Sequence, residues 1–146
     1  MDAIRRQDGK RFLMTDMPRS ELISAFFSAN LFVFASHVEY SPLVLFEAAA
    51  AGLPFLSVPV GNAGEIAAWT GAGEICEAQR DAAGHTLVSP GVLACAMMRL
   101  ARDPERLAQL GHQGRESWRK CYTWEKIVSQ YEAVISNGPP ASGRVS

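Results

Sequence analysis

The chain has 146 residues, of which 48% are hydrophobic and 20% are charged, a balance typical of one folded domain rather than a disordered chain. Its formal net charge of -1 gives no electrostatic reason to expect nucleic acid or an anionic membrane as a partner. No apolar run approaches the roughly 18 residues of a membrane-spanning helix, and the polar start of the chain does not look like a signal peptide. We therefore expect a cytoplasmic protein, with a membrane-peripheral full-length form as the alternative.

The apolar pattern alternates between short strand-like runs and segments with helical spacing. Continuous runs of β-branched and aromatic residues predict four strands, at 11–14, 31–34, 54–58 and 73–76. Helical spacing and terminal signals predict helices at 20–29, 42–52, 63–69, 89–103, 103–122 and 123–136. The alternation in the first half predicts an α/β fold with a Rossmann-like parallel sheet and flanking helices.

The domain organisation follows from the same pattern. We expect a polar lead-in at 1–10, one partial domain at 11–136, and a disordered tail at 137–146. About four strands are fewer than the five or six of a doubly wound domain, and no Gly-rich first turn is present. We therefore expect the latter part of a longer chain, with a smaller independent α/β domain as the alternative.

The segment "EYSPLVLFE" places a helix start directly after a predicted strand. In open parallel sheets, ligands bind at this carboxyl edge. With Ser41 as N-cap and Pro42 as the first helical residue, the amides of Leu43 and Val44 remain free donors at the positive end of a helix. The pattern predicts a phosphate or diphosphate position there.

Two carboxylates lie on either side of that position in the sequence. Glu47 falls in the second helical turn, and its side chain leans back toward the helix start, where it can accept two hydrogen bonds from a ribose diol. Glu39, in the preceding loop, can hold another hydroxylated group such as a sugar. The alternative is that both are solvated surface residues, which fits Glu47 less well because its neighbours are almost all apolar.

The run "EYSPLVLFEAAAAGLP" resembles the E-x7-E signature of retaining GT-B glycosyltransferases, the family 4 and glycogen synthase-like group. The preceding "LFVFAS", the following "GLPFLSVPVGNAGEI" and the terminal "DPERLAQLGHQGRESWRKCYTWEKIVSQYEAVI" are also similar to that group. The resemblance extends over residues 11–136 and implies the C-terminal, donor-binding half of a GT-B fold.

This resemblance implies a role for each matching residue. Glu47 would bind the ribose of a nucleotide donor, and the amides of Leu43 and Val44 would bind the diphosphate. Glu39 would be the catalytic-site carboxylate, which holds the donor sugar for front-face transfer. The resemblance also places three further residues in the donor loop: Tyr40, Ser41 and Pro42. The family often has Gly-Phe-Gly there, so "YSP" is a departure that affects the expected sugar preference.

Other family features are absent from the sequence. The basic residues near the start (Arg5, Arg6, Lys10 and Arg11) do not match the family's diphosphate-binding Arg/Lys pair, which we expect further upstream. The acceptor would be bound by an N-terminal domain that this chain lacks. Because no Asp-x-Asp motif is present, we expect neither a metal ion nor a cofactor, only a nucleotide-diphosphate-sugar as substrate.

The predicted function is therefore the donor-binding half of a retaining, hexosyltransferase-type glycosyltransferase, inactive as an isolated chain. Two alternatives stay open: a non-catalytic nucleotide-sugar-binding or interaction module, and a nucleotide-sugar epimerase on the same fold. His37 is either a plain loop residue or part of the donor-site lining, and Asn62 either has a structural role at a helix start or borders the donor cleft. The three cysteines have no metal-type spacing and predict buried free thiols: Cys76, Cys95 and Cys121.

Overall fold

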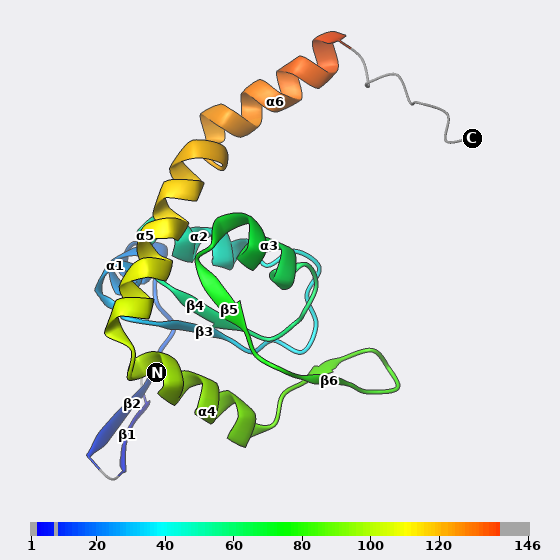
Figure 1. Ribbon diagram of the computed structural model, residues 1–146. Coiled ribbons are helices and arrows are strands. Elements are labelled where there is room, and N and C mark those ends of the chain that lie inside the picture. The colour runs from blue at the N-terminus through cyan, green and yellow to red at the C-terminus, as the bar shows by residue number, and fades with distance from the viewer. Residues whose placement is uncertain (1–2, 8, 138–146) are drawn as a thin grey trace.

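The computed structural model describes residues 3–7 and 9–137, which form three small sheets and six helices (Figure 1). The strands are β1 (Ala3–Gln7), β2 (Lys10–Met14), β3 (Phe32–Phe34), β4 (Phe55–Ser57), β5 (Gly73–Ile75), β6 (Gln79–Arg80) and β7 (Thr86–Leu87). The helices are α1 (Arg19–Ser28), α2 (Leu43–Ala51), α3 (Ala63–Thr70), α4 (Pro90–Ala101), α5 (Pro104–Cys121) and α6 (Trp124–Asn137).

The central sheet is parallel and has the strand order β3-β4-β5. The crossover helices α2 and α3 lie together along one side of it, while α6 extends away from the rest of the molecule (Figure 1). A strand, a helix and the next parallel strand therefore follow one another twice, as the alternating pattern predicts. The predicted α/β class, a Rossmann-like parallel sheet with flanking helices, is confirmed.

The core is centred on β4 and the face of α2 that covers it. Phe55 and Leu56 are 0% exposed because β4 has a neighbouring strand on each side and helices against the sheet. Leu45 of α2 is equally buried, beside the alanines that follow it. On α5, a Cβ added at Gly111 would lie 2.4 Å from the carbonyl oxygen of Gly52, so glycine permits the close approach of this helix to the end of α2.

The predicted strand at 11–14 exists, but its expected place in the parallel sheet is wrong. Strand β2 pairs antiparallel with β1 as a separate hairpin, in which Gly9 has a φ of 73°. All five residues of β2 are exposed, although continuous apolar runs are typical of strands that are buried on both faces. A tight turn closes a short loop at small entropic cost, so β2 pairs with its neighbour in sequence. The parallel sheet therefore has three strands, and the expected polar lead-in contributes β1.

The helices are close to their predicted positions, with one informative shift. The N-cap of α2 is Pro42, with an extended ψ of 91°, whereas Ser41 was expected there. The carbonyl of Pro42 accepts from the amide of Leu45 at 3.0 Å, which starts the helix one residue later than predicted. At the other end, the C-cap Gly52 has a left-handed φ of 71°, a conformation that favours glycine.

The thiols also differ from expectation. Cys76 is buried, but Cys95 and Cys121 are exposed because they lie on outward-facing positions of α4 and α5. The prediction of buried free thiols is therefore wrong for two of the three. The expected disordered tail at 137–146 lies outside the described residues, apart from Asn137, which ends α6.

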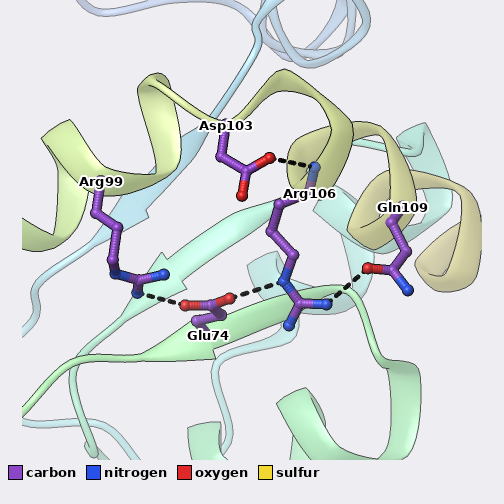
Figure 2. Close-up of polar contacts among 5 residues, drawn as sticks. All are labelled: Glu74, Arg99, Asp103, Arg106 and Gln109. Carbon is purple, nitrogen blue, oxygen red and sulfur yellow. Dashed lines mark hydrogen bonds and ion pairs between the residues drawn. The ribbon is translucent and has the colours of Figure 1, made fainter.

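A polar network fixes α4 and α5 to the sheet (Figure 2). The Glu74 carboxylate on β5 accepts from the guanidinium of Arg99 and, at 3.0 Å, from Nε of Arg106. Arg106 also donates to Gln109, and its amide donates to Asp103 Oδ1 at 2.9 Å, so Asp103 caps the start of α5. Burial raises the pKa of Glu74, but the hydrogen bonds from both arginines outweigh it and hold that pKa below its ordinary value near 4.5.

Among residues 3–7 and 9–137, no helix combines the length and apolarity needed to cross a membrane.

Candidate functional site

The start of α2 presents free hydrogen-bond donors at the carboxyl edge of the sheet. Pro42 is buried and has no amide hydrogen, so the first donors of the helix are the amides of Leu43 and Val44. Neither amide has an acceptor within the described part of the chain. Although the helix starts one residue later than predicted, these two amides are still free, because the first hydrogen bond of the helix is donated by the amide of Leu45. This end of α2 is suited to an anion by both its free amides and its dipole.

A small pocket of about 130 Å³ lies beside Glu39. Its lining comes from the loop after β3, the loop after β4 and the β6–β7 hairpin: His37, Val38, Glu39, Val60, Gly61, Arg80, Gly84 and Thr86. Two backbone hydrogen bonds hold these segments together, from Asn62 N to Tyr40 O at 3.0 Å and from Thr86 N to His37 O at 2.9 Å. The pocket therefore brings Glu39 together with His37 and with a hairpin that the sequence analysis did not predict.

Gly61 is required for the close approach of two of these loops. It has a φ of 52°, and a Cβ placed there would lie 2.3 Å from Tyr40 O and 2.7 Å from Glu39 O. Only glycine fits both this left-handed backbone and this contact. Gly61 therefore permits the close approach of its loop to the backbone of Glu39, and the glycines of "VGNAG" are the sequence signal for such a position.

The β6–β7 hairpin is rigidified at its tip. The Asp81 carboxylate accepts from the amides of Ala83 and His85, at 2.9 and 2.8 Å, and its other oxygen lies 2.9 Å from the His85 ring. The hydrogen bond from the His85 ring is the main reason that the pKa of Asp81 is lowered. This turn fixes the neighbouring strand residue Arg80, which had no signal in the sequence because the two-residue strands are too short to show alternation.

Glu47 lies outside the Glu39 pocket and has a partner of its own. Nη2 of Arg19, the first residue of α1, donates to Glu47 Oε1 at 2.8 Å. Both side chains reach solvent, with 72% of Arg19 and 40% of Glu47 exposed. Glu47 is therefore accessible from solvent, and Arg19 is a neighbour that the sequence pattern could not indicate, because the two residues are 28 positions apart.

The "YSP" triplet divides by exposure. Tyr40 is 92% exposed and Ser41 is also exposed, whereas Pro42 is buried under the helix start. Next to the pocket, Oδ1 of Asn62 is buried and has no hydrogen-bond partner within the described chain. Within residues 3–7 and 9–137, no group of three His, Cys, Asp or Glu side chains is arranged to hold a metal ion. The expectations of no metal and no cofactor stay predictions.

Comparison with known proteins identifies the family. The family model for group 1 glycosyl transferases matches residues 7–117, well over half of the chain. The chain belongs to this family. The membership confirms the resemblance to GT-B glycosyltransferases that the sequence motifs indicate.

Three relatives illustrate the match of this glycosyltransferase chain. It is 35% identical over 106 residues to N-acetyl-alpha-D-glucosaminyl L-malate synthase of Bacillus anthracis, and the match covers 73% of this chain and 26% of that protein. It is 29% identical over 113 residues to glycogen synthase of Mycobacterium tuberculosis, covering 77% and 25%. The structure of sucrose-phosphate synthase from Thermosynechococcus elongatus matches with a TM-score of 0.66 and 27% identity, covering 80% and 27%. The chain therefore spans about a quarter of the length of these relatives.

Proposed function

We propose that this chain is the nucleotide-sugar-binding half of a glycosyltransferase that transfers a sugar from a nucleotide diphosphate with retention of configuration. One observation carries the proposal. A helix start with two free amides, Leu43 and Val44, lies between the accessible carboxylates of Glu39 and Glu47 along the chain. The arrangement stands at the carboxyl edge of a parallel sheet, where ligands bind in open α/β folds.

Each part of a donor then has a matching group. The Glu47 carboxylate accepts hydrogen bonds from the ribose hydroxyls, and the amides at the start of α2 donate to the diphosphate. Glu39 accepts from hydroxyls of the sugar and keeps its anomeric carbon facing the acceptor. Tyr40, Ser41 and Pro42 line the approach to this loop. The pocket beside Glu39 offers further polar groups for a sugar, among them Arg80.

The same groups suit the charges that develop during transfer. As the bond between the sugar and the diphosphate breaks, positive charge grows on the sugar ring and negative charge on the leaving diphosphate. The N-terminus of α2 stabilises the negative charge with fixed dipoles that need no reorganisation. The Glu39 carboxylate stabilises the positive charge on the sugar. The retaining course of the reaction is part of this proposal.

The acceptor belongs to another part of the protein. The relatives are named for three different products, a glucosaminyl malate, glycogen and sucrose phosphate, so family membership does not select an acceptor. We propose that an N-terminal domain binds the acceptor, and that the 146-residue chain by itself binds donor without turnover. Transfer by this chain alone, in an assay with a panel of nucleotide-sugars and simple acceptors, would contradict that part of the proposal.

Isothermal titration calorimetry with UDP and GDP tests the donor site. The wild-type chain should bind at least one of them weakly, and Glu47→Ala should reduce the affinity about 10- to 150-fold, because hydrogen bonds to a charged group are worth about 1.5–3 kcal/mol. Glu132→Ala, which removes an exposed carboxylate from α6, is the matched control and should bind as the wild type does. Equal binding by wild type and Glu47→Ala would contradict the proposed binding of ribose by Glu47.

A further inference from the structure

We propose that Arg19 is a positioning residue for Glu47. The Arg19 guanidinium holds the Glu47 carboxylate so that the remaining acceptor sites of that carboxylate face a ribose diol. The inference rests on the proposed function, since it assumes that Glu47 binds ribose. It adds a residue from α1, outside the segment "EYSPLVLFE", to the donor site.

The contact is specific in geometry. Nη2 of Arg19 lies 2.8 Å from Oε1 of Glu47, the distance of a good charge-assisted hydrogen bond. Arg19 is the first residue of α1, and α1 contacts α2 directly. The guanidinium therefore reaches the carboxylate from a neighbouring helix, which packs against the core through the half-buried Phe26.

The contact leaves acceptor capacity for a ligand. An ionised carboxylate has about four lone-pair sites, and Arg19 uses one of them, on Oε1. No donor from the described part of the chain reaches Oε2 of Glu47. A vicinal diol can thus donate to Oε2 and to the second site of Oε1 without displacing Arg19. Binding and the ion pair are compatible.

The ion pair contributes more to preorganisation than to folding. Exposed pairs of this kind add little to stability, because solvent screens them. A free glutamate, however, must lose rotamer freedom when it binds a ligand, and a side chain that is already held avoids much of that cost. We therefore expect removal of Arg19 to weaken ribose binding about 3- to 10-fold.

The experiment compares a ribonucleoside diphosphate with its 2′-deoxy counterpart by calorimetry. The measured quantity is the dissociation constant of the 2′-deoxy form divided by that of the ribose form. It is measured for the wild type, for Arg19→Ala and Arg19→Lys, and for the control Arg102→Ala. Arg19→Ala should weaken the ribose form 3- to 10-fold and the deoxy form much less, so the ratio falls. Arg19→Lys keeps the charge and a donor and should restore most of the ratio, and Arg102→Ala, which changes another exposed arginine, should leave it unchanged.

The outcomes separate this inference from the proposed function. If Glu47→Ala lowers the ratio and Arg19→Ala does not, the Arg19 inference is overturned and the donor site stands. Tighter binding by Arg19→Ala would mean that the guanidinium competes with ribose, which also overturns it. Equal weakening of both ligands, with a lower melting temperature, would assign Arg19 a structural role instead. If the wild type binds neither ligand, or if Glu47→Ala leaves the ratio unchanged, the proposed function fails and this inference fails with it.

Discussion

Two regions of the molecule use carboxylates in opposite ways. In the network at β5, Glu74 has only 20% of its side chain exposed, and it accepts hydrogen bonds from two arginines on two helices. At the carboxyl edge of the sheet, Glu39 and Glu47 are accessible, and the backbone around Gly61 and the start of α2 holds the site. In the first region the carboxylate itself is the structural element, and in the second the backbone is.

The difference gives a physical criterion for a ligand-binding carboxylate. A structural carboxylate has its acceptor sites used by the protein and a pKa lowered by its partners, as Glu74 has. A carboxylate available to a ligand keeps acceptor sites open while its position is fixed by other means. Glu47, with one partner and a free Oε2, fits the second description. The following predictions test whether the two regions differ in this way, from the largest expected effect to the smallest.

Gly61→Ala should have the largest effect, because the candidate site at the carboxyl edge of the sheet depends on backbone geometry. The new Cβ meets Tyr40 O and Glu39 O at distances that require the loops to separate, in a left-handed conformation that alanine adopts poorly. We expect a loss of about 2–3 kcal/mol in the free energy of unfolding, measured by urea denaturation, and loss of nucleotide binding. Gly64→Ala, with nothing within 4 Å of its Cβ, is the control and should be neutral or slightly stabilising. Similar stability of both variants would show that the loop contact is unimportant.

Glu74→Gln and Glu47→Gln compare the two kinds of carboxylate directly. Glu74→Gln removes the charge that pairs with Arg99 and Arg106 and should cost about 1–2 kcal/mol of unfolding free energy. Glu47→Gln alters an exposed pair and should cost under about 0.5 kcal/mol. In nucleotide binding the order should be reversed, with Glu47→Gln the weaker binder. The same order in both measurements would contradict the division between structural and ligand-binding carboxylates.

Asp103→Ala should weaken the network through the helix end rather than through the ion pairs. Asp103 caps α5 by accepting from the Arg106 amide, and so holds the turn from which Arg106 reaches Glu74. We expect a cost of about 1 kcal/mol in thermal or urea unfolding. Ser89→Ala is the comparison, because Ser89 stands at the N-cap of α4 without a side-chain hydrogen bond and should change stability less. Equal losses would show that the hydrogen bond from the Arg106 amide to Asp103 does not matter for stability.

The smallest effect is the dependence of stability on pH. The pKa of Glu74 is lower in the folded chain than in the unfolded one, so its stabilising contribution is complete above the unfolded value near 4.5. That contribution is lost as the pH falls through the lower, folded pKa. The unfolding free energy of the wild type should therefore exceed that of Glu74→Gln by a constant amount from pH 7 to 5, and by less at pH 3. A difference that grows on acidification would contradict this account.

The local sequence predicted more of the candidate site at the carboxyl edge of the sheet than of the network around Glu74. All the local signals of this site lie within 14 residues, 39–52: two glutamates, a Ser-Pro before the apolar run and a glycine after that run. Propensity and spacing therefore indicate the loop, the helix and the free amides at its start. The exact N-cap moved by one residue, to Pro42, because its carbonyl rather than the Ser41 side chain starts the helix. The roles of these residues in binding remain predictions.

The sequence by itself determined the α/β alternation, the buried central strand and the helix start, because each depends on neighbouring residues and on hydrophobic periodicity. Only the tertiary structure decided which distant residues come together: Arg19 pairs with Glu47, two arginines pair with Glu74, and Arg80 lines the same pocket as Glu39. It also decided that β2 pairs with β1 rather than with the parallel sheet. The side-chain neighbours named above are far apart in the sequence, so no local pattern records them, whereas the β1–β2 hairpin joins neighbouring segments and only its separation from the parallel sheet had to be read from the structure.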